Sequence, residues 1–541
     1  MTTTLDRVRA AYRRLAETDR PEVWITLRPQ GEVEAEARAL DARPAGGLPL
    51  RGTLLAVKGN IDVAGLPTTA GCPSYAYRPA SDAPAVAALR AAGTIVLGTT
   101  NMDQFATGLV GTRSPYGAVR NAVDPLRVSG GSSSGSAVAV ALGVVDLALG
   151  TDTAGSGRVP AAFNGIVGVK PTRGLVPTDG VVPACASLDC VTVFARTLPQ
   201  ARRALAVLAS PQTPPRRPGP WRVAVAPAAQ LGELDAGWKA AYEAAAERLA
   251  ATGAELRTLD LTSFTEAAEL LYEGAFVAER YTAVGAFVDK GGPDLDPTVA
   301  RIITGARDLP AHRLFADRER LAALRVRAAA ELGDADALLL PTAPGHPTLA
   351  EVAADPLGAN TRLGRFTNST NLLDMCGVAV PSGTVHGLPF GVMLLGAAHT
   401  DDRIAEVAAL LDTPLRLTVV GAHLSGQPLN HQLVSLGARL AEVTTTEPSY
   451  RLYALATDPP KPGLVRVDKG GAAVEAEVWE LSAAALGAFT AALPRPMTLG
   501  SVLLADGRST PGFLCEPQAL PGAEDITEYG GWRAYLDRAR N

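Results

Sequence analysis

A lysine and a group of serines are the residues of this chain whose types and spacing could do chemistry. Lys58 stands within the largely apolar run of residues 52–63, Gly-Thr-Leu-Leu-Ala-Val-Lys-Gly-Asn-Ile-Asp-Val. The serines lie in Ser-Gly-Gly-Ser-Ser-Ser-Gly-Ser at 129–136 and in Gly-Thr-Asp-Thr-Ala-Gly-Ser-Gly-Arg at 150–158. Lysine acts as the base in some serine hydrolases that lack a histidine–aspartate pair. This combination could therefore activate a serine hydroxyl for attack on a carbonyl carbon.

Lys58 is unusual because lysine is rare in this chain and the neighbours of this lysine are apolar. The 50 lysines and arginines include only six lysines, and Lys58 follows Leu55, Ala56 and Val57 directly. If the amine is buried, its pKa falls and it becomes a usable base near neutral pH. If it stands at a strand end, its ammonium group can reach water instead. The sequence leaves both interpretations open.

The histidines of the chain lie far from this group in sequence. All six occur at position 312 or later, whereas the serines and glycines end before residue 160. The fold could still bring a histidine to the serines, but none of the six stands in a recognisable triad motif. The distribution favours a lysine base without excluding a histidine.

The serine- and glycine-rich segment at 129–136 has the composition of a flexible linker. Its flank argues against that role, because residues 137–145, Ala-Val-Ala-Val-Ala-Leu-Gly-Val-Val, are typical of a buried helix or strand. A phosphate loop of the Walker type would need Gly-Lys-Ser/Thr, which is absent. Residues 153–156, Thr-Ala-Gly-Ser, could instead surround one oxygen with backbone N–H groups, as an oxyanion hole requires.

Together these segments resemble the Ser–Ser–Lys apparatus of the amidase signature family, over roughly residues 20–410. The resemblance implies that Ser156 is the nucleophile and that Ser132, 24 positions earlier, is a bridging serine on a cis peptide bond. Neutral Lys58 would accept the proton of Ser132, which would accept the proton of Ser156. The products would be an acyl-enzyme and then, after attack by water, the free acid.

The same resemblance implies supporting roles for the loop around the nucleophile. The oxyanion hole would consist of backbone N–H groups from Thr153, Ala154, Gly155 and Ser156. Asp152 and Arg158 would fix that loop by hydrogen bonds, which is a structural role.

Within this family, four segments resemble the allophanate hydrolases: residues 21–26, 105–117, 153–161 and 271–281. By that resemblance, Tyr272 and Arg280 hold the carboxylate of the substrate, because a planar guanidinium binds a carboxylate through two hydrogen bonds. The two residues are eight positions apart, so we expect them on one face of a helix. The alternative is an ordinary amphipathic helix with a surface ion pair.

Composition limits the class of protein. A chain of 541 residues predicts two or three domains. The net charge of −5 comes without a basic tract, so we expect no nucleic-acid partner. The longest nearly apolar run, residues 137–150, is interrupted by Asp146 and is too short to cross a bilayer, so we expect no membrane partner.

The cysteines and the first residues of the chain predict a compartment. The five cysteines are scattered and odd in number, which is typical of free thiols in a reducing cytoplasm. The N-terminus lacks the apolar core of a signal peptide, so we expect a cytoplasmic protein. No Cys-x-x-Cys pair or His/Cys cluster predicts a metal site, and we expect neither a metal ion nor a cofactor.

Short apolar runs alternate with alanine-rich segments over residues 1–412, which predicts an α/β fold with a central mixed sheet covered by helices. Residues 1–45 and 236–289 read as helical segments, and 86–92 as a helix. Strands are expected at 94–97, 221–225 and 337–340, and residues 142–149 and 166–169 are expected to be buried. The proline-rich stretch 211–220 is predicted to be a surface connector.

Residues 413–541 predict a second, smaller α+β domain of short strands at 415–420, 450–455, 463–467 and 474–481, with a helix at 483–493. This part resembles the C-terminal domain of allophanate hydrolases, which implies a barrel like that of γ-glutamyl cyclotransferases. The amidotransferase subunit of the same family carries no such domain, so its presence argues against that function.

The resemblance also suggests a role for the second domain. Amide cleavage of allophanate leaves ammonia and N-carboxycarbamate, which must still lose carbon dioxide. His423, between Gly421 and Gly426, is the candidate to assist that step, and Glu477 is a weaker one. Alternatively, His423 only caps a turn, decarboxylation is spontaneous, and the domain serves stability or assembly as a homodimer. The sequence leaves both alternatives open.

The sequence therefore predicts a hydrolase of allophanate that yields ammonia and carbon dioxide in urea or triazine nitrogen metabolism. It would act downstream of a urea carboxylase or of cyanuric acid or biuret hydrolases. One alternative is a signature amidase for another small acid amide such as malonamate. Another is a subunit that feeds ammonia to a partner. A non-enzymatic scaffold is disfavoured because Lys58, Ser132 and Ser156 are all present.

Overall fold

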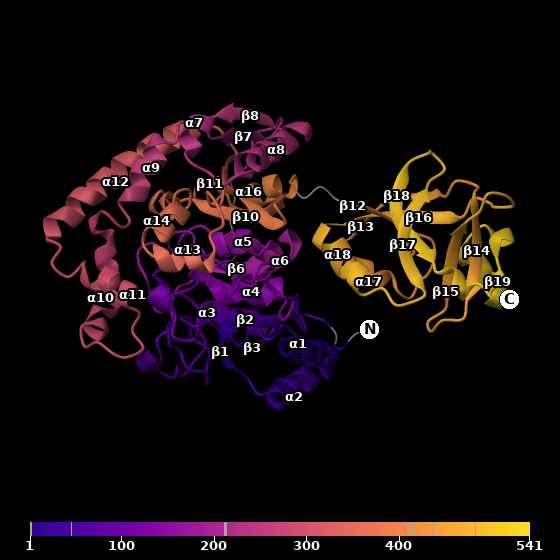
Figure 1. Ribbon diagram of the computed structural model, residues 1–541, viewed down its shortest axis with the longest axis horizontal. Coiled ribbons are helices and arrows are strands. Elements are labelled where there is room, and N and C mark those ends of the chain that lie inside the picture. The colour runs from indigo at the N-terminus through magenta and orange to yellow at the C-terminus, as the bar shows by residue number, and fades with distance from the viewer. Residues whose placement is uncertain are drawn as a thin grey trace. The chain divides into compact units, whose positions relative to one another are not determined.

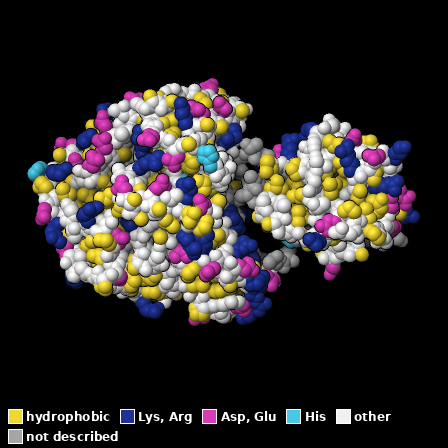
Figure 2. Space-filling model, viewed as in Figure 1, with side chains coloured by type: hydrophobic (Ala, Val, Ile, Leu, Met, Phe, Trp, Pro, Cys, Tyr) yellow, Lys and Arg dark blue, Asp and Glu magenta, His cyan; other side chains and the backbone are white. Residues whose placement is uncertain are grey.

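The computed structural model describes residues 3–44, 46–209, 214–411, 415–436, 438–481 and 483–540. The chain forms two compact units, Met1–Leu411 and Asp412–Asn541 (Figure 1). Charged side chains of both signs are interspersed over the visible face of each unit (Figure 2). This distribution differs from the basic stripe of nucleic-acid-binding proteins.

In the described part of the first unit, eleven strands form one mixed sheet, which confirms the predicted α/β fold. β2 pairs in parallel with β3 and β4, whereas β4 and β6 pair antiparallel. In spatial order the strands are β1 (Trp24–Leu27), β3 (Ile95–Thr100), β2 (Leu54–Lys58), β4 (Leu147–Asp152), β6 (Cys190–Ala195), β5 (Val167–Lys170), β10 (Cys376–Val385), β11 (Leu388–Gly396), β9 (Ala337–Pro341), β7 (Arg222–Val225) and β8 (Glu255–Thr258).

The central strands are buried along their whole length because helices pack against the sheet. β2, β4, β6 and β9 expose almost nothing, and most of their residues are apolar, as in strands covered on both faces. The α-helices are α1 (Thr4–Thr18), α2 (Gln30–Asp41), α3 (Pro84–Ala91), α4 (Ser134–Ala141), α5 (Val159–Phe163), α6 (Leu198–Leu208), α7 (Ala228–Leu231), α8 (Trp238–Ala251), α9 (Thr262–Glu269), α10 (Ala278–Val288), α11 (Pro297–Thr304), α12 (Ala311–Leu332), α13 (Leu349–Ala354), α14 (Gly358–Leu363), α15 (Ser369–Leu372) and α16 (Asp401–Ala409).

The three predicted strands of this unit are present as β3, β7 and β9, with ends shifted by up to three residues, and residues 166–169, predicted to be buried, lie largely in β5. The apolar run that follows the serines is a helix, α4, rather than a strand. The prediction that residues 1–45 are helical was incomplete, because β1 lies between α1 and α2. This four-residue strand pairs only with β3 at the sheet edge and is half-buried, so its sequence carries little strand signal. Part of the predicted connector at 211–220 lies outside the described residues.

The second unit contains two sheets and a separate core. One sheet has the order β13-β16-β12-β18-β17 and the other β15-β14-β19, and apolar residues such as Leu417, Tyr450 and Trp479 fill the space between the elements. The strands are β12 (Leu415–Val419), β13 (Arg439–Thr445), β14 (Tyr450–Leu455), β15 (Lys461–Arg466), β16 (Glu475–Leu481), β17 (Met497–Leu503), β18 (Ser509–Cys515) and β19 (Glu524–Asp525), and the helices are α17 (Asn430–Ser435), α18 (Ala483–Ala491) and α19 (Trp532–Arg540). The four predicted strands and the predicted helix are present, whereas β13, β17, β18, β19 and two helices were missed.

No helix in the described ranges combines the length and the apolar composition needed to cross a bilayer. The five cysteines are buried free thiols. Among the described side chains, no group of three or more His, Cys, Asp or Glu residues is placed to hold a metal ion.

Candidate active site

Lys58 is the last residue of β2, and its side chain is completely buried. Its Nζ lies 2.8 Å from Ser132 Oγ and 2.7 Å from Thr151 Oγ1. Burial lowers the pKa of Lys58 to about 7, although the nearby carboxylates of Asp103 and Asp189 act in the opposite direction. Of the two interpretations that the sequence left open, the structure therefore shows the buried amine and excludes the water-exposed one.

Ser132 lies in a loop that Asp103 holds in place. The Gly131–Ser132 peptide bond is cis, and the carbonyl of Ser132 accepts a hydrogen bond of 3.1 Å from the N–H of Asp103. The Asp103 carboxylate accepts backbone N–H groups of Gly111 and Arg113, each at 3.0 Å. A β-carbon at Gly131 would lie 2.1 Å from Asp103 Oδ2, so only glycine fits at this position.

The loop that carries Ser156 begins where β4 ends, and the Asp152 carboxylate organises it. This carboxylate accepts the N–H groups of Gly155 and Gly157 at 2.9 and 3.0 Å, and pairs with Arg158 Nε at 2.9 Å. Burial alone would raise the pKa of Asp152, but the Arg158 guanidinium, Lys170 and the N–H of Gly157 together outweigh burial and lower it. Asp152 therefore stays charged and fixes the loop on which Ser156 sits, itself buried.

The backbone of this loop leaves hydrogen-bond donors free. In the described part of the chain, no acceptor engages the N–H groups of Thr153, Ala154 or Ser156. The N–H of Gly155 differs, because it already donates to Asp152. Gly155 has φ +124°, and a β-carbon there would lie 2.3 Å from Thr367 Oγ1. Three of the four N–H groups expected in an oxyanion hole are thus available.

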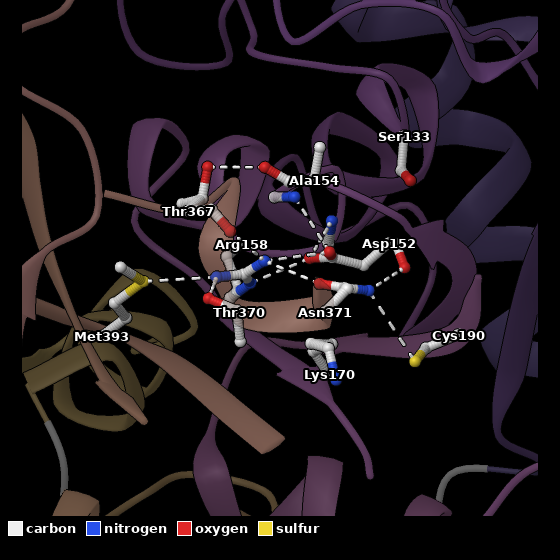
Figure 3. A network of polar contacts seen from close by, with 12 residues as sticks. Ser133, Asp152, Ala154, Arg158, Lys170, Cys190, Thr367, Thr370, Asn371 and Met393 are labelled. Atoms are coloured by element: carbon white, nitrogen blue, oxygen red, sulfur yellow. Dashed lines mark hydrogen bonds and ion pairs between the residues drawn. The ribbon is translucent and has the colours of Figure 1, made fainter. Parts of the chain in front are cut away.

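A distant segment of the chain braces the same loop through Arg158. The buried guanidinium donates to Thr370 Oγ1 at 2.7 Å and to the carbonyl of Thr367 at 3.1 Å. Thr367 Oγ1 donates to the carbonyl of Ala154 at 2.6 Å, and Asn371 Nδ2 to that of Asp152 at 2.8 Å. Figure 3 shows the contacts of Arg158 together with those that Thr367 and Asn371 make to the loop. The loop is therefore held on both sides, by its own carboxylate and by residues 367–371.

Arg280 and Tyr272 are in contact, but they do not share a helix. Arg280 lies in the first turn of α10, whereas Tyr272 lies in a turn after α9, and Gly274 between them is extended. The prediction of one continuous helix was therefore wrong, because the chain turns between the two residues. Arg280 Nη2 nevertheless lies 3.3 Å from Tyr272 Oη, and its guanidinium carbon lies 4.9 Å from the ring centroid.

The Arg280 guanidinium is buried and has hydrogen-bonding capacity to spare. Its Nη1 donates to Cys185 Sγ at 2.9 Å, and burial raises the pKa of that thiol to about 12, so the sulfur is uncharged. Within the described residues, no carboxylate forms a direct ion pair with Arg280, although the charge of buried Asp189 acts on it, and its Nε has no acceptor. A buried cation in this state favours an anionic ligand.

Several residues of this site were missed by the sequence analysis. Thr151 lies within the quoted run at 150–158, yet nothing in that run identified it as a partner of Lys58. The others are Asp103, Asp189, Thr367, Thr370 and Asn371. The one signal in the sequence that could have identified these residues is a polar residue that interrupts an apolar run.

In the second unit, His423 lines a cavity of about 180 Å³. Its ring stacks on Phe513 and meets Phe489 edge-on, with both centroid distances 5.1 Å, and its Nε2 lies 2.9 Å from Gln432 Oε1. Burial lowers the pKa of His423, so the imidazole is neutral at pH 7. Lys461 also lines this cavity and supplies its positive charge.

Glu477 does not line that cavity. Its carboxylate pairs with Arg533 Nη2 at 2.6 Å and accepts from the N–H of Ser425 at 2.8 Å and from Trp479 Nε1 at 3.0 Å. The structure therefore places His423 at the cavity and Glu477 in an ion pair with further hydrogen bonds. It does not bring the two residues together.

Comparison with known proteins gives consistent matches for both units. Residues 6–405 match the family Amidase, and residues 415–537 match the family Allophanate hydrolase C-terminal domain. The chain is 40% identical to urea amidolyase of Saccharomyces cerevisiae over 95% of its own length, and it spans only 31% of that relative. It is 36% identical to a glutamyl-tRNA(Gln) amidotransferase subunit of Symbiobacterium thermophilum, over 74% of this chain and 91% of that relative.

Among solved structures, Kluyveromyces lactis allophanate hydrolase matches with a TM-score of 0.71 and 38% identity. The match covers 99% of this chain and 97% of that protein, and so includes both units. The amidotransferase relative, by contrast, matches a shorter share of the chain.

A first prediction concerns the ion pair beneath the Ser156 loop. Replacing Arg158 by methionine leaves the buried Asp152 carboxylate without its charged partner, so we expect the free energy of unfolding to fall by about 3–5 kcal/mol. Urea denaturation measures this change. The control is Arg327→Met, which breaks the exposed pair with Glu266 and should have a much smaller effect. Equal losses in the two variants would contradict the structural role assigned to Arg158.

Proposed function

The chain belongs to the amidase family, and from that premise we propose that it hydrolyses allophanate, the urea-1-carboxylate anion. As an amidohydrolase it acts on C–N bonds, and the proposed products are ammonia and N-carboxycarbamate. The observation that carries the proposal is a buried Lys58–Ser132 pair in the same unit as Arg280, a buried cation without a carboxylate partner. The match to Kluyveromyces lactis allophanate hydrolase along nearly the whole chain supports it.

The proposed reaction begins with proton transfer towards Lys58. Neutral Lys58 donates one N–H to Thr151 Oγ1. The lone pair of the Lys58 nitrogen is then directed at Ser132 Oγ. Ser132 gives its proton to Lys58 and takes the proton of Ser156, whose Oγ attacks the amide carbon. When the tetrahedral intermediate collapses, the C–N bond breaks and the returned proton leaves with ammonia. Water then hydrolyses the acyl-enzyme by the same proton path.

The negative oxygen of the intermediate needs donors that are already in place. In the proposal these are the free N–H groups of Thr153, Ala154 and Ser156. Gly155 supports the loop through its bond to Asp152, and its lack of a side chain lets Thr367 approach. Asp152 and Arg158 act by holding this geometry.

The substrate carboxylate would bind Arg280, which is buried and forms no direct ion pair with a carboxylate among the described residues. The free Nε and the hydroxyl of Tyr272 are the donors that we assign to it. Binding would then give the guanidinium a charge-assisted hydrogen bond. Malonamate has a methylene where allophanate has an N–H, so a signature amidase for malonamate is the second candidate.

We further propose that the second unit assists decarboxylation of N-carboxycarbamate. In that step a C–N bond breaks, its electron pair stays on nitrogen, and nitrogen takes a proton. His423 would supply the proton, because a doubly charged ligand in the cavity beside Lys461 favours the protonated imidazole. Glu477 would support the fold around Ser425.

The oligomeric state, the compartment and the metabolic role of the protein are also proposals. We propose a homodimer in the cytoplasm, where buried free thiols persist, and a second unit of the γ-glutamyl-cyclotransferase type. The likeness to urea amidolyase supports a place in urea nitrogen metabolism, downstream of a urea carboxylase. Cyanuric acid or biuret hydrolases are the other upstream candidates.

The decisive experiment measures ammonia released from allophanate by the purified chain, with malonamate, biuret and urea as comparisons. We expect release from allophanate in preference to the others, and none with Ser156→Ala, because the acyl-enzyme cannot form. Activity on malonamate alone would favour the second candidate. No free ammonia, together with co-purification of another protein, would indicate a subunit that feeds ammonia to a partner.

A second test uses pH. Lys58 must be neutral to accept a proton, and burial lowers its pKa to about 7. We therefore expect kcat/KM to fall as pH drops below about 7 and to level off above it. Lys58→Arg cannot deprotonate, so it should be inactive across the range. An acid limb two pH units lower, or activity in Lys58→Arg, would assign the base to another group.

A third test addresses the second unit. In His423→Asn the release of the first ammonia from allophanate should be unchanged, whereas release of the second should slow, because N-carboxycarbamate would lose its proton donor. Time-resolved ammonia and carbon dioxide assays separate the two steps. The matched control is His431→Asn, an exposed histidine of α17 whose Nδ1 only contacts the carbonyl of Pro428. Unchanged release of both ammonia molecules would mean that decarboxylation is spontaneous.

A further inference from the structure

Asp189 is a buried carboxylate that the proposed reaction does not use. It immediately precedes β6, and both of its oxygens are engaged. Oδ2 accepts the N–H of Ala184 at 2.9 Å, and both oxygens lie 3.2 Å from the N–H of Cys185. Oδ1 also accepts a short hydrogen bond from Thr153 Oγ1. The carboxylate therefore joins its own loop, residues 184–189, to the loop that carries Ser156.

The loop 184–189 also contacts the other end of the proposed site. Cys185 Sγ accepts from Arg280 Nη1 at 2.9 Å, and the N–H of Ser187 donates to Glu279 Oε2, next to Arg280 in sequence, at 2.8 Å. A path of direct hydrogen bonds thus runs from Thr153 through Asp189 and Cys185 to Arg280. Every side chain on this path is buried.

We propose that Asp189 is a positioning residue that sets the spacing between the Ser156 loop and the Arg280 guanidinium, and thereby selects the length of the acid amide. This inference rests on the proposed function. The reacting carbonyl and the carboxylate belong to one small, covalently linked substrate. The separation of the two protein elements therefore decides which substrate can satisfy both at once. A misplacement of about 1 Å can lower a rate about 100-fold.

The charge of Asp189 matters as well as its shape. Arg280 and Lys58 are the cations that act on it, and the donors that it meets are N–H and O–H groups. Asparagine has the same volume but would present an NH₂ group to at least one of these donors. The substitution should therefore move the loop 184–189 without leaving a cavity.

The test compares Asp189→Asn with the wild type on three acid amides. These are allophanate, malonamate, and succinamate, whose carboxylate lies one methylene further from its amide than in malonamate. We expect the ratio of kcat/KM for allophanate to that for succinamate to fall about 10- to 100-fold, because the spacing is no longer fixed. Asp401→Asn is the matched control. That buried carboxylate also holds a backbone N–H and a threonine hydroxyl, both from Thr172, and should leave the ratio unchanged.

A second pair of variants tests the hydrogen bond between Thr153 and Asp189 by changing Thr153. Thr153→Val removes the hydroxyl and should reproduce the loss of selectivity, whereas Thr153→Ser keeps it and should retain selectivity. An equal loss of kcat/KM on short and long substrates, or wild-type selectivity in Thr153→Val, would overturn the positioning role while leaving the proposed function intact. A wild-type chain that releases ammonia from none of the three amides would overturn the proposed function and this inference with it.

Discussion

The proposed site depends on keeping one amine, that of Lys58, out of water, so that it loses its proton near neutral pH. Burial alone achieves this, but three buried carboxylates lie close enough to favour the ammonium form: Asp103, Asp189 and Asp152. Each is engaged by other donors. Asp103 and Asp189 accept backbone N–H groups, and Asp152 pairs with Arg158. Because none of them contacts Lys58 directly, their attraction lowers the cost of the charge without outweighing burial. The hydrogen bonds that hold these carboxylates in place therefore also influence the basicity of Lys58, which burial mainly sets.

The sheet explains how groups distant in sequence reach this amine. β2 and β4 are parallel neighbours, with Val57 opposite Leu149, so their carboxyl ends place Lys58 beside Thr151. The Ser156 loop leaves the end of β4, and the helix that follows Ser132, α4, packs on the same two strands. Lys58 and Ser156 therefore come from the carboxyl ends of two adjacent strands, and Ser132 from the loop before the helix that packs on them. Placement at the carboxyl ends of parallel strands is typical of ligand sites in α/β sheets.

Local pattern accounts for what could be predicted from sequence. The segments around Lys58, Ser132 and Ser156 were recognisable because each combines a buried apolar run with glycine or serine at fixed spacing. Asp189 and Asn371 were not, because their contacts join residues 36 and 219 positions apart and leave no periodic signal. The Tyr272–Arg280 pair was predicted only in part. The two residues do meet, but through a turn at Gly274 rather than along a helix face.

The arginines of the two units show how a structural charge differs from one available to a ligand. Arg158 pairs with Asp152, and Arg533 with Glu477, so both guanidinium groups have a carboxylate partner in the folded chain. Arg280 is as buried as Arg158, but its hydrogen-bond partners are a thiol and a phenol, and an aromatic face lies beside it. The charge of Asp189 acts on this guanidinium, but among the described residues no carboxylate pairs with it directly. Its Nε therefore remains free for an acceptor, and this is the capacity that the proposed binding of a substrate carboxylate would use.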